Sequence, residues 1–323
     1  MKEKQNGKIG FRLPTDMTLK QIYKKYGIII VMIVLIAVAG IIEPIFLTSK
    51  NIVNVLRQVS INGILAVGMT FVIISGGIDL SLGSIVGFSG MVSVMIMPEI
   101  GILPAILVAL ACGIVIGFIN GLCIYNGVPE FIMTLATLTS IRGLAYYISN
   151  GQPFPGTDEA YKFIGQSSIG PVPMPVIVFI VVVALAFFVL RKTTFGRSVY
   201  AIGGSSEASR LSGINIFKTK VAIYMLSGFL ASVAAIVLTS RLYSCDPTIG
   251  EGYELDAITA TVIGGTSMSG GEGSVLRTVI GVLIIGILSN ILNLLSVSPY
   301  IQEIVKGLII FGAVAADTWK KSK

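Results

Sequence analysis

The sequence predicts an all-α fold, a polytopic membrane helix bundle of about ten transmembrane helices, some of them short or broken. Two features of the composition lead to this prediction: only 12% of the 323 residues are charged, and 54% are hydrophobic. Soluble domains carry about a quarter charged residues, so this chain holds half the usual share. The third observation is a mean hydropathy of +0.89, concentrated in apolar runs long enough to cross a bilayer.

The predicted spans are apolar runs of roughly 17 to 25 residues, separated by turn residues and charges. The clearest are 26–42, 60–75, 81–97, 102–125, 131–149, 173–190, 221–240, 275–295 and 300–316. A tenth run, 255–266, is too short to be assigned by hydropathy alone. The basic start and small residues of the first run also resemble a cleavable secretory signal. Its apolar stretch continues through Ile42, which favours an uncleaved first helix.

Basic residues decide the doubtful crossing, because cytoplasmic loops of membrane proteins are enriched in Lys and Arg. Placing every basic cluster in the cytoplasm requires an even number of crossings after the sixth span, so 255–266 is counted as a short or broken one. Both termini are then cytoplasmic, and the net charge of +7 reflects topology rather than nucleic-acid binding. The clusters are Lys2, Lys4, Lys8, Arg12, Lys20, Lys24 and Lys25; Arg191, Lys192, Arg197, Arg210, Lys218 and Lys220; and Lys320, Lys321 and Lys323.

Several kinds of chemistry are excluded by residues that the chain lacks. It contains no histidine, which excludes an imidazole base, a histidine-ligated metal and a Ser-His-Asp triad. Cys112, Cys123 and Cys245 show no metal-binding or disulfide spacing, so we expect them to be packing residues. No GxxxxGK[ST] pattern occurs, so the chain has no Walker loop for ATP. We therefore expect no catalytic residue, metal or cofactor on this chain.

Two glycine-centred breaks interrupt the apolar pattern. Residues 72–84 (VIISGGIDLSLGS) are echoed by residues 262–274 (VIGGTSMSGGEGS), with two extra residues in the second loop. Broken helices in corresponding halves of a transporter often line the substrate path, because water or solute can satisfy their exposed backbone groups. The alternative is that both are simple turns between antiparallel helices, and both interpretations stay open. As path candidates, the breaks contribute Gly76, Gly77, Gly264 and Gly265.

Charged residues inside or beside the spans are few. Asp79 follows the first break, where it either lines a wet cavity or caps the helix that begins near Ser81; we favour the cap. Glu303 and Lys306 lie three residues apart on one helical face, so they are positioned to pair. A proton- or sodium-coupled carrier needs a denser set of embedded carboxylates, so coupling to an ion gradient is not expected.

Neutral hydrogen-bonding residues are more frequent in the spans than charges. Such groups bond helices together in lipid, and a group of them also suits an uncharged polyol better than an anion. We therefore include four of them, with Asp79 and the breaks, in a predicted translocation path. The four are Asn62, Asn120, Asn290 and Asn293; Thr134, Thr137 and Thr139 belong to the same class of neutral residues.

The basic segment between the sixth and seventh spans contains a predicted short helix. Either Ser205 or Ser206 can cap its start, Glu207 in the first turn suits the helix dipole, and Gly213 can end it. Two turns are too few to fold alone, which indicates docking into a partner; the alternative is an ordinary surface turn with basic flanks. The candidate coupling residues are Ser205, Ser206, Glu207, Ala208, Leu211 and Gly213.

At these residues the chain resembles the permease subunits of bacterial ribose-type ABC sugar importers, over nearly all its length from about residue 51 to 317. Related permeases for xylose, galactosides and autoinducers share most of the motifs. One departure occurs at 128–131 (VPEF), where Glu130 stands in place of an expected alanine. The stretches that carry the resemblance are 76–81 (GGIDLS), 118–121 (FING), 194–197 (TFGR), 210–214 (RLSGI), 252–258 (GYELDAI) and 262–267 (VIGGTS).

The resemblance implies a multi-pass protein of the bacterial cell membrane that works with other chains. It implies a homodimer or a paired heterodimer of permeases, cytoplasmic ATPase subunits that hold ATP and magnesium, and an extracytoplasmic sugar-binding protein. It also implies that Ser205–Gly213 seats in the ATPase. The domain organisation expected is a cytoplasmic segment 1–25, a permease domain 26–318 that includes the coupling segment 191–220, and a cytoplasmic tail 319–323.

Two other functions are weighed against a sugar permease driven by a separate ATPase. A self-sufficient secondary carrier or channel would transport solute without any ATPase, and uptake by the purified chain would identify it. An intramembrane enzyme is disfavoured because the chain has neither histidine nor a clustered acid or metal set. The sequence does not distinguish among sugars.

Overall fold

The computed structural model describes residues 19–321, so residues 1–18 and 322–323 of the two predicted terminal segments lie outside the described part. The helices are α1 (Leu19–Ile42), η1 (Pro44–Leu47), α2 (Ser49–Ile74), α3 (Leu82–Ile100), α4 (Ile102–Tyr125), α5 (Glu130–Ser149), η2 (Glu159–Tyr161), α6 (Lys162–Gln166), α7 (Met174–Lys192), α8 (Thr194–Gly204), α9 (Ser206–Leu211), α10 (Ile216–Leu242), α11 (Tyr253–Ile263), α12 (Val275–Leu294) and α13 (Pro299–Lys321). The strands are β1 (Phe154–Pro155), β2 (Ser168–Ile169), β3 (Val172–Pro173) and β4 (Ser244–Cys245).

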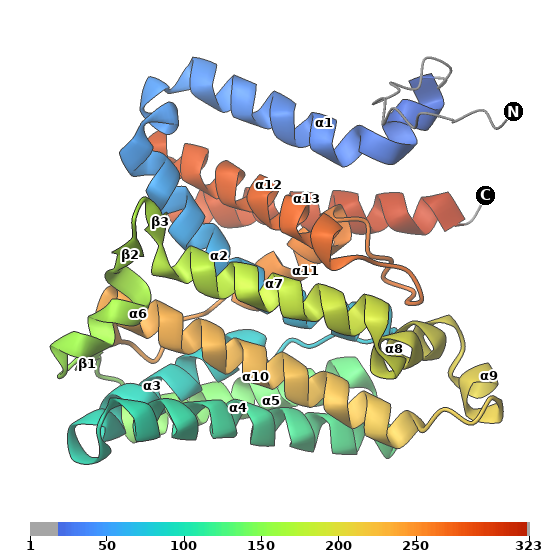
Figure 1. The fold of residues 1–323 in the computed structure, drawn as a ribbon, viewed down its shortest axis with the longest axis horizontal. Coiled ribbons are helices and arrows are strands. Elements are labelled where there is room, and N and C mark those ends of the chain that lie inside the picture. Colours follow the sequence, from blue (N-terminus) through green and yellow to red (C-terminus); the bar gives the residue numbers. More distant parts are fainter. Residues whose placement is uncertain (1–18, 322–323) are drawn as a thin grey trace, which may run out of the picture.

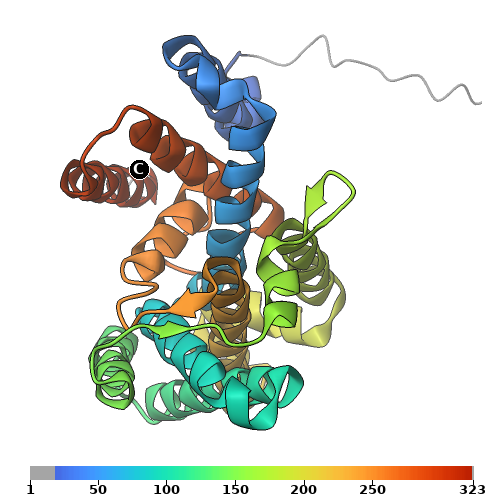
Figure 2. The same ribbon diagram turned by 90° about the vertical axis from the view of Figure 1, so that its left-hand side faces the viewer.

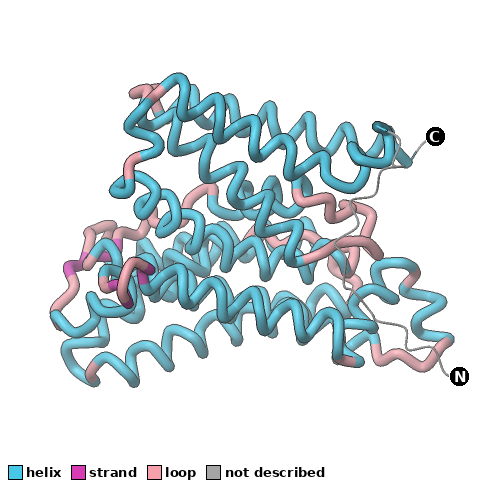
Figure 3. The backbone as a smooth tube through the Cα atoms, turned by 45° about the horizontal axis from the view of Figure 1, so that its top comes forward, coloured by secondary structure: helices cyan, strands magenta, loops and turns pink. Residues whose placement is uncertain are grey.

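The long helices lie side by side along one axis of the molecule, as Figure 1 shows. The start of α1, the end of α13 and the pair α8–α9 all lie at one end of this bundle (Figure 1). We call this end the α9 end. The short strands, α6 and the α3–α4 turn lie at the opposite end, and Figure 3 shows how little strand structure the described residues contain. The start of α1 and the end of α13 thus lie at the same end of the bundle.

The predicted all-α membrane bundle is confirmed. Among the described residues, seven helices are long and apolar enough to cross a membrane: α2, α3, α4, α5, α7, α10 and α12. Helix α1 adds an apolar stretch at Gly27–Ile42, and α13 runs the length of the bundle (Figure 1). Helix α11 has 11 residues. At 1.5 Å per residue it is about 16 Å long, roughly half a bilayer, so the tenth crossing is short, as predicted.

The core is built around α2 and α10, which are the most buried of the candidate spans. Helix α4 packs tightly along α10 because glycines remove side chains from the contact. A Cβ atom at Gly113 or Gly117 would overlap the backbone of Gly228 or Tyr224 on α10. The glycine pattern of α4 therefore serves packing within the chain. In the end-on view of Figure 2, α13 and α5 stand at the edges of the bundle.

Helix α2 begins eleven residues earlier than its hydropathy predicts. Its first turns carry polar residues that interrupt the apolar pattern, but protein groups satisfy them. Thr48 caps the helix by accepting a bond from the Asn51 N–H at 3.4 Å. The Asn51 amide donates to the Phe46 carbonyl at 3.0 Å and exchanges two 2.9 Å bonds with Asn290 of α12. A hydropathy window counts such residues as polar, whereas the folded chain keeps them in the helix.

Two small antiparallel sheets close the end opposite α9. Strand β1 pairs with β4, with Phe154 opposite Cys245, and β2 pairs with β3, with Ser168 opposite Pro173. The β1–β4 pair joins the loop after α5 to the loop after α10, which are about ninety residues apart in the chain. Cys245 is buried in this contact with a free thiol. All three cysteines are free, which agrees with packing roles.

Candidate functional site

The segment between α7 and α10 folds as two capped helices. Thr193 accepts a bond from the Gly196 N–H at 3.1 Å and starts α8. Ser205 accepts a bond from the Ala208 N–H at 3.2 Å and starts α9, so of the two predicted caps Ser205 is the one used. Gly213 then adopts φ +82°, and its N–H bonds the Arg210 carbonyl at 3.0 Å. The short helix predicted from capping residues is confirmed.

All six predicted coupling residues are exposed on α9 and its flanks. Leu211 is 80% exposed, so its apolar side chain is free to contact a partner. Ser209, on the opposite side of α9, is buried. Helix α9 therefore stays attached by one face while it presents its other face outward, which is the arrangement expected for a docking element. The exposed residues are Ser205, Ser206, Glu207, Ala208, Leu211 and Gly213.

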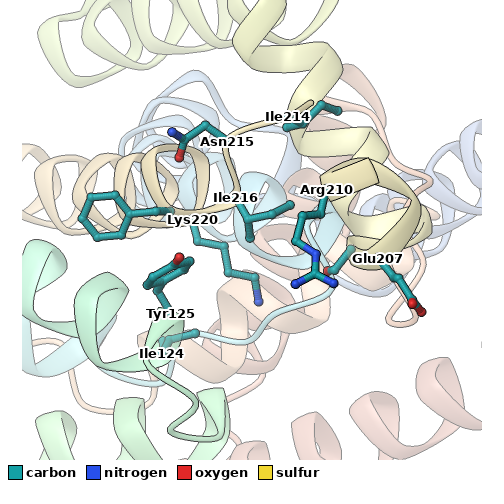
Figure 4. A pocket seen from close by; sticks show the side chains of 10 residues that line it. Ile124, Tyr125, Glu207, Arg210, Ile214, Asn215, Ile216 and Lys220 are labelled. Atoms are coloured by element: carbon teal, nitrogen blue, oxygen red, sulfur yellow. The ribbon is translucent and has the colours of Figure 1, made fainter. Parts of the chain in front are cut away.

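Beside α9 lies a groove of about 700 Å³. Figure 4 shows Arg210 of α9 and Lys220 of α10 reaching toward the groove, while the Glu207 carboxylate points away from them. Arg210 therefore carries positive charge to one side of α9, and the Glu207 carboxylate lies on its other side. The lining residues are Ile124, Tyr125, Ser206, Glu207, Arg210, Ile214, Asn215, Ile216, Phe217 and Lys220.

Glu130, the residue that departs from the expected motif, has a defined partner at this end. Its carboxylate forms an ion pair with Lys220, and both side chains are about four-fifths buried. A Cβ atom at Gly77 would lie 2.8 Å from the Glu130 carboxylate and 2.7 Å from the Tyr224 hydroxyl. The pair thus ties the start of α5 to α10 and rests against the first break.

The first break is a buried loop held by Asp79. The Asp79 carboxylate accepts bonds from the Ser81 N–H at 3.0 Å, the Ser81 hydroxyl at 2.5 Å and the Ser227 hydroxyl at 2.7 Å. Burial raises the pKa of this carboxyl, and the bonds from Ser81 and Ser227 oppose the rise. Helix α3 starts at Leu82, with Ser81 rather than Asp79 in the N-cap position. Asp79 therefore connects the loop to α10 instead of capping α3 directly.

Asn120 extends this hydrogen-bonded network to two more helices. Its amide donates to the Ser81 hydroxyl at 3.0 Å, and its carbonyl oxygen accepts a bond from Thr137 of α5 at 2.6 Å. Asn120 and Thr137 also line a cavity of about 240 Å³ between α4 and α5. Together with Asp79, they form a continuous chain of bonds from α5 through α4 and the break to α10.

The second break follows the C-terminal end of α11, just as the first break follows the C-terminal end of α2. Gly265 adopts φ +83°, a left-handed conformation that favours glycine. Gly264 packs against α12, where a Cβ atom would lie 2.8 Å from the Arg277 carbonyl oxygen. The Gly271 N–H bonds the carbonyl of Ile74, the last residue of α2, at 2.8 Å. The two echoing sequences therefore meet in space.

The other predicted path residues lie apart from one another. Asn62 donates to Asp256 of α11 at 3.3 Å, and Asn290 is engaged by Asn51. Asn293 accepts a bond from Gln302 of α13 at 2.9 Å. Each of these three connects two helices, and the structure does not gather them with Asn120 around one cavity among the described residues.

A charged contact that the sequence did not predict joins α13 to α11. Lys306 lies 2.9 Å from the Asp256 carboxylate, which also accepts the bond from Asn62. The side chain of Asp256 is only 8% exposed. The predicted Glu303–Lys306 pair is not formed, because Glu303 points outward and is exposed. Asp256 stands in the 252–258 motif, but fifty residues separate it from Lys306, so spacing alone could not pair them.

Arg142 fixes the loop that leads into α11. Its guanidinium donates to the carbonyls of Pro247 at 2.5 Å, Ile249 at 2.9 Å and Gly83 at 3.0 Å. These three bonds hold the loop onto α3. The short crossing is thus positioned from both sides, by Arg142 before its start and by Asp256 within its first turn.

Comparison with known proteins agrees with this architecture. Residues 51–314 match the family model described as branched-chain amino acid transport system / permease component. The ribose import permease protein of Haemophilus influenzae is 45% identical, covering 91% of this chain and 93% of that protein. Its counterpart in Bacillus subtilis is 46% identical, covering 93% and 95%. The L-arabinose transport system permease protein of Escherichia coli is 37% identical, covering 95% and 94%.

No solved structure matches the chain significantly. The family match spans most of the chain, including both breaks and the α8–α9 segment. The relatives are similar over more than nine-tenths of their own lengths, so the similarity covers whole permeases rather than one segment. The chain therefore belongs to the family of branched-chain amino acid transport system permease components.

Proposed function

We propose that this chain is the membrane-spanning permease subunit of an ATP-binding cassette importer that carries a monosaccharide, ribose or a related sugar. The observation that carries the proposal is the exposed, capped helix α9 on a bundle of membrane-spanning helices whose sequence has no Walker loop. Relatives described as permeases for ribose and L-arabinose support a pentose-like substrate. In this proposal the chain forms the path of the sugar across the membrane, and separate subunits hydrolyse ATP with magnesium.

The partners follow from the two ends of the bundle. A cytoplasmic ATPase docks on α9 and the adjacent groove, where Arg210 supplies positive charge beside the exposed Leu211. An extracytoplasmic sugar-binding protein docks on the opposite end. In this proposal the α9 end faces the cytoplasm of a bacterial cell with both termini on that side, and the basic residues around α8 and α9 support this by the positive-inside rule.

A second copy of the chain completes the proposed transporter. Helix α5 has few buried residues, and its exposed positions include Thr139 and Ser140 as well as Leu135 and Tyr147. A face with polar residues at membrane depth suits a partner or a solute better than lipid. The sugar path proposed here runs along such faces and past the two breaks, which bring Gly76, Gly77, Asp79, Gly264 and Gly265 into the same region.

The test uses a charge reversal on α9 in purified complexes. Glu207→Lys changes an exposed first-turn acid, and it also opposes the positive end of the helix dipole. We expect less ATPase to copurify with the permease and less ATP-dependent uptake in vesicles. Glu159→Lys reverses another exposed charge, one paired with Lys162 at the other end of the bundle, and should leave ATPase association unchanged. Normal association and uptake by Glu207→Lys would contradict the docking role.

One observation favours the alternative of a self-sufficient secondary carrier. Asp79, Glu254 and Asp256 are all buried, so the folded chain holds more buried carboxylates than the sequences of the spans indicated. Asp79 and Asp256, however, already have hydrogen-bonding or ionic partners. Uptake by the purified chain without ATPase, driven by an ion gradient, would establish the carrier and replace the proposal above.

A further inference from the structure

Four glycines from three distant segments meet at the end of α8. We call them the glycine junction: Gly76 of the first break, Gly203 of α8, and Gly270 and Gly271 of the second break. A Cβ atom at Gly270 would lie 2.7 Å from the Gly203 carbonyl oxygen and 3.0 Å from the Cα of Gly76. The three segments therefore touch through their backbones.

Gly203 stands at the centre of the glycine junction. A Cβ atom there would overlap the Ile74 carbonyl oxygen and lie 2.5 Å from the Gly271 nitrogen. Those two atoms form the 2.8 Å hydrogen bond that joins the end of α2 to the second break. Helix α8 therefore presses against a backbone bond that links the end of α2 to the second break.

A second contact holds α8 to the second break. The Tyr200 hydroxyl donates to the Gly273 carbonyl at 2.9 Å. Burial raises the pKa of the Tyr200 phenol, so the hydroxyl keeps its proton at neutral pH and stays a donor. Ile202, one residue before Gly203, is buried, and the Phe195 ring stacks on Phe71 of α2 at a centroid distance of 6.4 Å. Helix α8 is thus seated firmly along its length.

The position of the glycine junction relative to α9 suggests its role. Gly204 and the cap Ser205 are all that separate Gly203 from α9, which is exposed. A displacement of α9 therefore reaches Gly203 through a short, capped connection. Backbone atoms in direct contact have no rotamers that could absorb the displacement, and packed interiors transmit strain. Both α2 and α11 end at the breaks that Gly203 touches.

We propose that Gly203 is a positioning residue through which movement of α9 reaches both membrane breaks at once, so that the ends of α2 and α11 shift together. This inference rests on the proposed function, because α9 needs an ATPase partner to move it. It makes the two echoing breaks parts of one mechanical contact rather than separate turns. Glycine is required at 203 because any side chain would separate α8 from the Ile74–Gly271 bond.

The test compares Gly203→Ala with Gly204→Ala in the permease–ATPase complex, reconstituted with the binding protein and ribose. The two glycines are neighbours at the end of one helix, but a Cβ atom at Gly204 meets no atom within 4 Å. We expect Gly203→Ala to assemble with the ATPase and hydrolyse ATP, with about tenfold less ribose transported per ATP. Gly204→Ala should transport at the rate of the unmodified complex.

The outcomes separate this inference from the proposed function. If the unmodified permease neither binds the ATPase nor transports ribose or a related pentose, the proposed function fails. If it transports normally and Gly203→Ala transports equally well per ATP, only the inference is overturned. If Gly203→Ala does not assemble with the ATPase, Tyr200→Phe becomes the deciding variant. It removes only the hydroxyl that bonds Gly273 and keeps the ring. A lower transport-to-ATP ratio in Tyr200→Phe supports the inference, and an unchanged ratio overturns it.

Discussion

At the scale of single residues, Asp79 shows how one buried carboxylate can organise a break. It receives bonds from one N–H and two hydroxyls, and it is fully buried. Asp79→Ala leaves these donors without an acceptor, which costs about 1–3 kcal/mol for a buried donor. We expect a lower thermal unfolding midpoint in detergent. Asp79→Asn keeps an acceptor for the Ser81 N–H and should lower the midpoint less.

Asp246 provides the matched control for Asp79. It accepts bonds from the Thr248 N–H at 2.8 Å and the Thr248 hydroxyl at 2.5 Å, the same local pattern where the bonds are open to solvent. Water replaces the lost acceptor there, so Asp246→Ala should change the midpoint little.

The Thr248 bonds also lower the pKa of Asp246. Their contribution to stability is therefore present at neutral pH and lost as pH falls through that lowered value. Equal effects of the two alanine variants would contradict the burial argument.

At the scale of elements, an ion pair to a buried carboxylate helps attach α13 to α11. It packs mainly against α11, and Lys306 reaches Asp256 across that contact. Lys306→Met leaves the buried Asp256 carboxylate unpaired, which typically costs about 3–5 kcal/mol. We expect a lower thermal unfolding midpoint and faster proteolysis of α13. The double variant Lys306→Met/Asp256→Asn should recover most of the loss.

Glu303→Gln is the control for that element, because Glu303 lies one turn from Lys306 on α13 and is exposed. Glu303→Gln removes a charge from the same helix without touching Asp256, so the thermal unfolding midpoint of this variant should match that of the unmodified chain. If Glu303→Gln destabilised α13 as much as Lys306→Met, the attachment would depend on the charge of the helix rather than on the ion pair.

At the scale of the whole molecule, the arrangement predicts which surfaces face each side of the membrane. Ser212, next to α9, and Asp158, at the opposite end, are both exposed. In a chain whose three cysteines are replaced by serine, Ser212→Cys should react with an impermeant thiol reagent only in inverted vesicles. Asp158→Cys should react only in intact spheroplasts. Labelling of both from one side would refute the ten-crossing topology.

Much of the fold could be predicted because its signals are local. Apolar run length identified the spans, and the sorting of basic residues supplied the short tenth crossing that α11 provides. Ser205 and Gly213 marked the ends of α9, since a cap depends only on neighbouring residues. Hydropathy misplaced the start of α2, because the groups that satisfy Asn51 come from Phe46 and from Asn290 of α12.

The sequence by itself therefore determined the membrane class, the helical architecture and the capped, exposed helix α9, all of which follow from composition and short-range pattern. Only the tertiary structure decided the contacts between distant segments. It paired Lys306 with Asp256 instead of Glu303, and it brought Gly76 and Gly270 together against Gly203. The physical reason is that such contacts depend on how whole helices pack, and glycine backbones leave no side-chain pattern that could reveal their partners in advance.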